Sequence, residues 1–200
     1  MRVIGLTGGV GTGKTTVSQM LQSLGAVLVD ADKVGHQSYL PDSPAWKDII
    51  AEWGEGLLQP NREIDRKKLG AIVFENSGAL AKLNHMVHPR MRDMIQRQLK
   101  DLERQGVEVV VFEAAILIEA GWADLASEVW TTDVPEDVVV RRLQGRSGWT
   151  EEQIKARINS QLPRAERLGH AQVVISTDCT LDELRARVKA LWQQRMASVE

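Results

Sequence analysis

The chain has 200 residues, 43% of them hydrophobic and 26% charged, which suits one globular domain with a sizeable core. Its formal net charge of −2 gives no global basic field, which argues against a nucleic-acid partner. We therefore expect local cationic side chains and backbone N–H groups to hold any anionic ligand. The single cysteine, Cys179, excludes an internal disulfide. No apolar stretch is as long as the segment of about 20 residues that is needed to span a bilayer. With no room for a signal peptide before the first strand-like run, we expect a cytoplasmic protein without a membrane partner.

Short apolar runs alternate with helical patterns along most of the chain. Strands are expected at residues 2–6, 27–29, 107–112, 128–132 and 173–175. Helices are expected over 14–24, from Pro135 to about Arg146, after a capping box at Thr150 and Gln153, and over 181–196. This alternation predicts an α/β protein whose five-stranded parallel sheet is flanked by helices.

Residues 33–105 interrupt the alternation. They carry no strong strand signal, and helices are expected around 44–53, 65–74, 77–86 and 89–105. Pro89 is expected in the first turn of the last helix, where its missing N–H costs no hydrogen bond. We interpret 33–105 as a helical insertion into a single domain whose core comprises 1–32 and 106–200.

Residues 8–15 match G-x-x-x-x-G-K-[ST], the pattern of a phosphate-binding P-loop. They lie between a predicted strand and a predicted helix, as this motif requires, which argues against a chance glycine-rich turn. Backbone N–H groups would form an anion nest, Lys14 would reach the β- and γ-phosphates, Thr15 would bind Mg²⁺, and Thr16 could donate to the α-phosphate. The ATP-binding residues predicted from the motif are Gly8, Gly9, Gly11, Thr12, Gly13, Lys14, Thr15 and Thr16. We therefore expect a P-loop NTPase fold with Mg²⁺ and ATP.

Three acids end predicted strands, where the ligand crevice of an open α/β sheet lies. They are Asp30, Asp32 and Glu113. We favour Asp32 as the acid that orients the acceptor hydroxyl, and expect Asp30 or Glu113 to reach the Mg²⁺ through water. Either aspartate could instead cap the next helix, but two caps are not expected, because alternate residues of an extended stretch face the same side.

Arginines gather at the helix that begins at Pro135. Arg142 and Arg146 share a helical face, and like charges side by side repel unless an anion lies between them. We interpret Arg142 as catalytic and both as ATP-binding residues in a small lid, residues 142–165, and Arg141 as part of a solvated basic face.

Further motifs follow the P-loop. They are Val29-Asp30-Ala31-Asp32-Lys33, Ile64-Asp65-Arg66 with Leu69 and Val73-Phe74, Leu83-Asn84-His85-Met86-Val87-His88-Pro89, Ile116-Leu117-Ile118-Glu119, Arg142-Leu143 with Arg146, and Gln161. With the P-loop they cover nearly the whole chain, which thereby resembles the dephospho-CoA kinases, the last enzymes of coenzyme A biosynthesis. Some segments are closer to the kinase half of animal bifunctional CoA synthase.

The resemblance implies transfer of the γ-phosphoryl group of ATP to the 3′-hydroxyl of dephospho-CoA, by a monomer or weak homo-oligomer. It implies that Asp32 lies near that hydroxyl and Arg142 over the moving phosphate, and that the insertion binds the acceptor. Arg66, His88 and Glu119 would belong to the acceptor side. Family residues at the adenine edge are replaced at Gln172 and at Ser176-Thr177, so these contacts are not predicted.

Other functions share these motifs. Another small-metabolite or nucleoside monophosphate kinase of the P-loop class would keep the same cradle. A GTPase-like switch is disfavoured, because Asp32-Lys33-Val34-Gly35 comes too soon after the P-loop and no Asn-Lys-x-Asp guanine reader exists. A scaffold without turnover is disfavoured by the lysine, acids and arginines that transfer requires.

Overall fold

A computed structural model of the protein describes residues 1–197, apart from the side chains of Phe74 and Glu75. The last three residues of the expected core, 198–200, and the Phe74 side chain quoted for the resemblance therefore lie outside the described part. The chain forms two compact units, one made of Met1–Val29 and the chain from Leu102 onward, the other of Asp30–Asp101. Within residues 1–197 no helix has the length and apolar character needed to cross a membrane.

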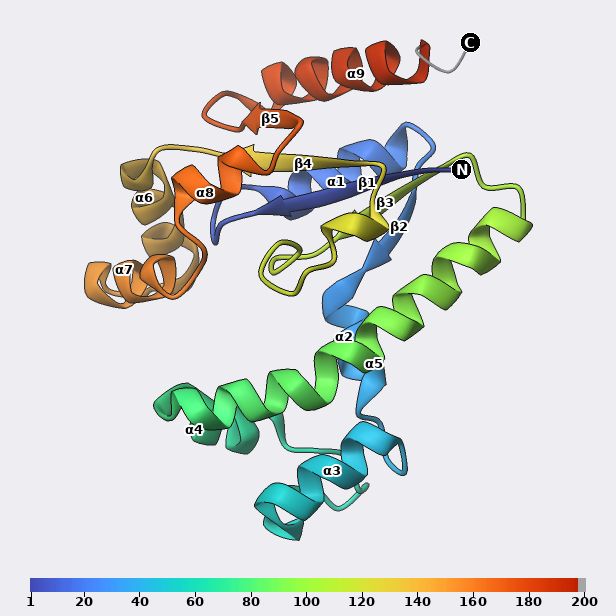
Figure 1. The fold of residues 1–200 in the computed structure, drawn as a ribbon. Coiled ribbons are helices and arrows are strands. Elements are labelled where there is room, and N and C mark those ends of the chain that lie inside the picture. Colours follow the sequence, from blue (N-terminus) through green and yellow to red (C-terminus); the bar gives the residue numbers. More distant parts are fainter. Residues whose placement is uncertain (198–200) are drawn as a thin grey trace. The chain divides into compact units, whose positions relative to one another are not determined.

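The first unit contains a five-stranded parallel sheet flanked by helices, as predicted (Figure 1). Its strands are β1 (Arg2–Gly8), β2 (Val27–Asp30), β3 (Val109–Glu113), β4 (Glu128–Asp133) and β5 (Val173–Ser176). Their order is β2-β3-β1-β4-β5, so β1 lies at the centre, with Gly8 opposite Thr132 of β4. The carboxyl end of β1, where the P-loop begins, is thereby surrounded by the ends of its neighbours.

Two helices cover one face of the sheet, namely α1 (Lys14–Ser23) and α9 (Leu181–Ala197). They bury Val17 and Leu21 of α1 and Leu184 and Val188 of α9 against the apolar side chains of the strands. This packing anchors the start of α1, and with it the P-loop, to the centre of the sheet.

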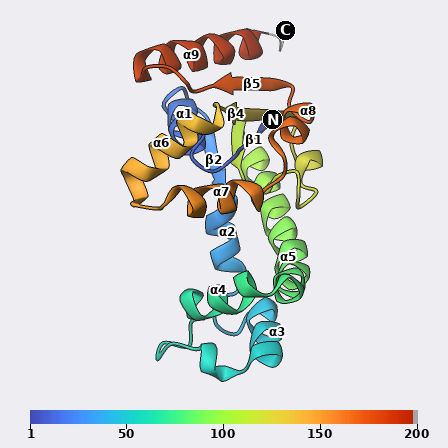
Figure 2. The ribbon, with the colours of Figure 1, turned by 90° about the vertical axis from the view of Figure 1, so that its left-hand side faces the viewer.

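Three helices follow β4, and Figure 1 shows α6 and α7 beyond the carboxyl ends of β1 and β4, an edge that Figure 2 turns toward the viewer. They are α6 (Glu136–Ser147), α7 (Glu151–Asn159) and α8 (Arg164–Gly169). The predicted Thr150–Gln153 capping box opens α7, and α8 was not predicted. Val10 of the P-loop packs with Leu143 of α6 and Ile154 of α7 in one apolar cluster, so these helices are held against the cradle.

The second unit is helical. Its helices are α2 (Ala31–Ser38), α3 (Pro44–Trp53), α4 (Arg66–Glu75) and α5 (Ser77–Arg104), with a 3-10 turn, η1, at Glu55–Leu57. A second such turn, η2 (Ala123–Leu125), precedes β4 in the first unit. Helix α2 was not predicted from the sequence.

The prediction that a new helix begins at Pro89 is wrong, since α5 continues through this residue. A proline inside a helix removes one hydrogen bond and costs about 3 kcal/mol. The residues that α5 buries on both sides of it, Val87, Met91, Ile95 and Leu99, recur every fourth position along one stripe. Burying such side chains is worth about 1.5–3 kcal/mol each, which outweighs the local cost.

Candidate active site

The P-loop joins β1 to α1 through a backbone that depends on glycine. Gly11 has φ +73° and Gly13, the N-cap of α1, has φ +88°, values that side-chain-bearing residues rarely adopt. A β-carbon at Gly8 would lie 2.1 Å from Thr132 Oγ1, and one at Gly11 would lie 3.1 Å from Leu143 Cγ. The predicted loop therefore fits tightly between β4 and α6.

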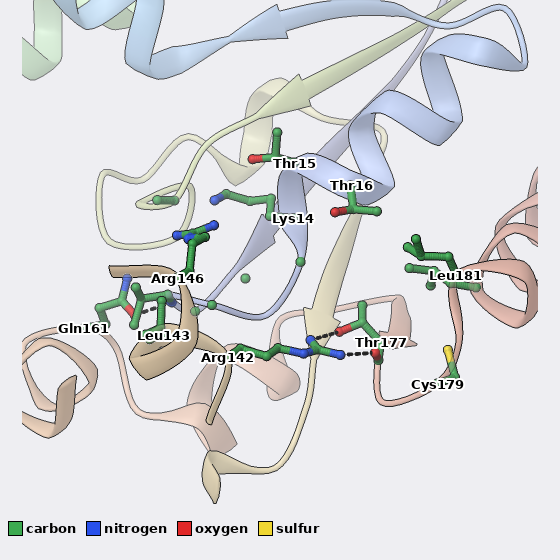
Figure 3. Close-up of a pocket in the computed structure, with 17 residues that line it drawn as sticks. Lys14, Thr15, Thr16, Arg142, Leu143, Arg146, Gln161, Thr177, Cys179 and Leu181 are labelled. Atoms are coloured by element: carbon green, nitrogen blue, oxygen red, sulfur yellow. Dashed lines mark hydrogen bonds between the residues drawn. The ribbon is translucent and has the colours of Figure 1, made fainter. Parts of the chain in front are cut away.

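A cavity of about 650 Å³ opens over this loop (Figure 3). Its walls are the P-loop and the start of α1, three residues of α6, Ala115, Gln161, and a segment from Thr177 to Leu184. The cavity thus brings backbone N–H groups at a helix N-terminus together with cationic side chains, which is an anion-binding arrangement. All the P-loop residues predicted to bind ATP line it except Thr12.

Thr12 is buried behind the loop. Its Oγ1 donates to Gly9 O (2.8 Å) and lies 2.7 Å from Thr132 Oγ1. The side chain is therefore occupied in supporting the loop, and Thr12 can serve a nucleotide only through its backbone.

Glu113, the last residue of β3, meets the first two residues of α1. Its Oε1 lies 3.8 Å from Lys14 Nζ and 3.4 Å from Thr15 Oγ1. This contact follows from the pairing of β3 with β1, which sets the end of one strand beside the loop that leaves the other. The site thus combines a hydroxyl, a carboxylate and an ammonium group, and the two oxygen donors are those that Mg²⁺ prefers.

The two predicted lid arginines point in different directions. Arg142 donates through Nη1 to Thr177 Oγ1 (3.0 Å) and through Nη2 to Thr177 O (2.5 Å). Thr177 Oγ1 in turn donates to Thr12 O (2.8 Å), so a chain of hydrogen bonds links α6 to the P-loop. Arg146 is exposed, and Figure 3 shows its guanidinium directed toward Lys14. Two cations on one side of a cavity favour an anion between them.

The expectation that Asp30 and Asp32 are alternate residues of one extended stretch is wrong. Asp30 ends β2 and caps α2, its carboxylate accepting from the N–H groups of Asp32 (2.9 Å) and Lys33 (3.3 Å). Asp32 lies in the first turn of α2, because the helix begins one residue after the strand ends. Asp30 is therefore the helix cap, and the Asp32 side chain does not cap α2.

The remaining candidates have separate surroundings. Burial raises the pKa of Tyr39, and the positive charge of Arg66, at the start of α4, opposes this shift. Burial lowers the pKa of His88 in α5. Glu119, predicted on the acceptor side, accepts through Oε1 from the Leu162 N–H at 3.3 Å in the link between α7 and α8.

Two pocket residues had no role assigned from sequence. Gln161 accepts through Oε1 from the Val10 N–H at 2.8 Å. Thr177, only 2% exposed, joins Arg142 to the P-loop. Gln161 was noticed only within the resemblance, and Thr177 only as a departure from it. Their positions just after α7 and just after β5 were the available signal, since residues that follow strands and helices at this edge reach the crevice.

Comparison with known proteins gives a consistent result. A family model described as dephospho-CoA kinase matches residues 2–183. A dephospho-CoA kinase from Geobacter sulfurreducens is 42% identical over 195 residues, covering 98% of this chain and 99% of that protein. One from Geobacillus kaustophilus is 41% identical over 191 residues, covering 96% and 95%.

Solved structures agree. The dephospho-CoA kinase from Campylobacter jejuni matches with a TM-score of 0.76 and 27% identity over 100% of both chains. The protein TT1252 from Thermus thermophilus matches with a TM-score of 0.79 and 28% identity, covering 96% of this chain and 97% of that one. A shikimate kinase from Acinetobacter baumannii, 15% identical with a TM-score of 0.54 over 100% of this chain and 95% of that one, shares the fold.

Proposed function

The chain belongs to the dephospho-CoA kinase family and is an ATP-dependent kinase, and from this premise we propose how its residues move the phosphoryl group to the 3′-hydroxyl of dephospho-CoA. The observation that carries the proposal is the cavity lined by the P-loop, Lys14 and Arg146, with Glu113 beside Lys14. In the reaction the acceptor oxygen bonds to the γ-phosphorus, the bond to the β,γ-bridging oxygen breaks, and ADP leaves.

The nucleotide phosphates lie on the side of the cavity where Lys14 and Arg146 face each other. In a loose transition state negative charge spreads over the oxygens of the moving group, and prearranged cations stabilise it without reorganisation. Backbone N–H groups of the loop hold the β-phosphate, and Thr16 donates to the α-phosphate. Arg146, which no hydrogen bond among the described residues restrains, is the better candidate for contact with the γ-phosphate.

The nucleotide base lies at the other side, near Thr177, Cys179 and Leu181. Arg142 is already hydrogen-bonded there to Thr177, so its planar guanidinium is positioned toward the base rather than over the γ-phosphate. We therefore move Arg142 from the transferring phosphate, where the resemblance put it, to a role in nucleotide binding. Apolar Leu181 and Leu184 in the cavity wall suit an aromatic ring.

Thr15 and Glu113 are the residues that would hold Mg²⁺, Thr15 directly and Glu113 through water. Their oxygens lie 3.4 Å apart, and a hydroxyl and one carboxylate leave room for phosphate oxygens and water, as Mg²⁺ requires. When bound, Mg²⁺ neutralises charge that develops on the β- and γ-phosphates. Asp30 is a weaker candidate, because its carboxylate already caps α2.

On the acceptor side, Asp32 accepts a hydrogen bond from the 3′-hydroxyl and takes its proton late in the transfer. The support is that Asp32 lies two residues after the end of β2, in the first turn of α2, and, unlike Asp30, is not used as a helix cap. Arg66 and His88 contribute to binding dephospho-CoA. Glu119 is left out of the acceptor site, because its carboxylate accepts from Leu162.

The proposal is tested by measuring ADP formation with ATP and Mg²⁺ in the presence of dephospho-CoA, AMP or shikimate in turn. We expect turnover with dephospho-CoA, a product heavier by one phosphate, and a ³¹P signal of a 3′-phosphomonoester. Turnover with AMP or shikimate but not dephospho-CoA would support another P-loop kinase instead. GTP replaces ATP in a parallel assay, where a preference for GTP would favour a switch protein.

We further propose that the protein works in the cytoplasm with these small molecules as its partners, as a monomer or weak homo-oligomer. The composition, with one cysteine and no broad basic field, supports this setting. Light scattering after size-exclusion chromatography measures the oligomeric state.

A further inference from the structure

The peptide between Gly9 and Val10 is held at both of its polar ends. The Val10 N–H donates to Gln161 Oε1 at 2.8 Å (dashed in Figure 3), and the Gly9 carbonyl accepts from Thr12 Oγ1 at 2.8 Å and Thr12 N at 3.3 Å. Because a trans peptide is planar, its N–H and C=O point in opposite directions. The two contacts therefore fix the rotation of this peptide about the chain.

One of these contacts is anchored in the sheet. Thr12 is 5% exposed, and its Oγ1 lies 2.7 Å from Thr132 Oγ1 in β4. The carbonyl end of the peptide is thereby tied to the centre of the first unit. The N–H end depends on Gln161, which comes after α7 and belongs to no strand or helix.

The link that carries Gln161 is itself pinned by two charged side chains. Its next residue, Leu162, donates its N–H to Glu119 Oε1 at 3.3 Å and accepts at its carbonyl from Arg167 Nη2 at 2.6 Å. The peptide groups before and after Leu162 are thus both restrained, and the backbone that carries the Gln161 side chain is held in place.

Arg167 also lies close to the loop at Gly9. The residue is 7% exposed, and its Nη1 lies 3.1 Å from the position that a β-carbon on Gly9 would occupy. Burial lowers the pKa of Arg167, while Glu119 and Asp133 oppose the shift by favouring the charged form. A guanidinium so enclosed has little freedom, so it acts as a wall for the loop at Gly9.

We propose that Gln161 is a positioning residue for the phosphate cradle, acting through the Gly9–Val10 peptide, and that Glu119 and Arg167 hold it in place. The loop around Val10 is rich in glycine and loses much conformational freedom when it binds phosphate. With the peptide already oriented, the N–H groups that follow it need less reordering to meet the nucleotide. The inference rests on the P-loop as the ATP site.

The test compares Gln161→Met, which keeps the length but removes the acceptor, with Gln161→Glu, which keeps an acceptor oxygen. In Gln161→Met the KM for ATP rises about three- to tenfold, the factor that one lost hydrogen bond supplies, while the KM for dephospho-CoA stays within about twofold. The Val10 amide resonance in ¹H–¹⁵N spectra of the nucleotide-free protein moves in Gln161→Met and keeps a hydrogen-bonded shift in Gln161→Glu. Gln193→Met, the same change at an exposed position of α9, leaves all three quantities at wild-type values.

Three outcomes would overturn the inference. They are an unmoved Val10 resonance in Gln161→Met, an unchanged KM for ATP, and a rise of both KM values by the same factor together with a lower Tm, which would indicate a merely structural residue. If the wild-type protein does not phosphorylate dephospho-CoA, the proposed function fails, but the Val10 resonance and the Kd of Mg-ATP still decide the role of Gln161. Glu119→Ala gives a second reading, because it should raise the KM for ATP and not that for dephospho-CoA.

Discussion

Lys14 and Glu113 form a mostly buried ion pair across the P-loop, with 3.8 Å between Nζ and Oε1 and side chains that are 17% and 11% exposed. The lysine follows the loop that leaves β1, and the glutamate ends β3, so parallel strand pairing brings the two together. In the free protein the carboxylate thus holds the ammonium group near the place where phosphates bind. The pair gives two separate predictions, one for each partner.

Lys14→Ala should lower turnover by about 10²–10³-fold or more, the loss that accompanies removal of one prearranged charge-stabilising donor. Initial rates at saturating ATP and dephospho-CoA measure the effect. Lys189→Ala, which removes an exposed lysine of α9, serves as the control and should not change the rate. Near-normal turnover in Lys14→Ala would exclude its role in transfer.

Glu113→Gln should raise the Mg²⁺ concentration needed for half-maximal rate, because an amide is a weaker partner than a carboxylate for a water bound to the metal. The titration of rate against free Mg²⁺ at fixed ATP measures the shift. At saturating Mg²⁺ most of the rate should return. A rate that falls equally at all Mg²⁺ concentrations would show that Glu113 acts elsewhere.

Asp32→Asn should depress kcat far more than it weakens ATP binding, because the side chain faces the acceptor hydroxyl in our proposal and not the nucleotide. Steady-state kinetics and calorimetric titration with a non-hydrolysable ATP analogue measure the two quantities. The matched change Asp30→Asn removes a negative charge at the N-cap of α2, while the asparagine amide keeps an oxygen that can still accept the capping hydrogen bonds. Equal losses of kcat and affinity in Asp32→Asn would contradict the assignment.

Arg142→Ala and Arg146→Ala should separate stability from activity. Arg142 makes two hydrogen bonds to Thr177, so its loss should lower the free energy of unfolding by about 1–3 kcal/mol and weaken ATP binding. Arg146 is exposed, so its loss should change stability by less than about 0.5 kcal/mol while lowering kcat. Urea denaturation and initial rates measure these effects, and the reverse pattern would refute our placement of the two arginines.

His88 should make the protein sensitive to mild acid. Burial lowers the pKa of His88 in the folded state below the ordinary histidine value of 6.5, which applies to the unfolded state. The unfolded state therefore takes up a proton first as the pH falls. Stability is therefore full above this value and is lost as the pH decreases toward the lower pKa of the folded state. Between pH 7 and pH 5 the free energy of unfolding should fall more for the wild type than for His88→Gln, and equal losses would refute the prediction.

The strands and the P-loop could be predicted because their signals are local. A run such as residues 109–112 is apolar along its whole length. The loop pattern requires glycine at Gly8 and Gly13, and Gly13 has a φ of +88° that side-chain-bearing residues rarely adopt. The helix break at Pro89 was predicted from an equally local rule, and it failed because burial along α5 outweighs the missing hydrogen bond. Helix α2 was missed because it follows β2 without a turn between them.

The sequence alone predicts that residues 8–16 bind a triphosphate, and it determines which kinds of side chain are available around them. Only the tertiary structure decided that Glu113 reaches Lys14, that Arg142 is bound to Thr177, and that Gln161 holds the Val10 amide. The physical reason is that a backbone preference acts within a few residues, whereas a side-chain contact depends on which strands become neighbours. The order β2-β3-β1-β4-β5, which brings these partners to one edge of the sheet, is a property of the folded chain.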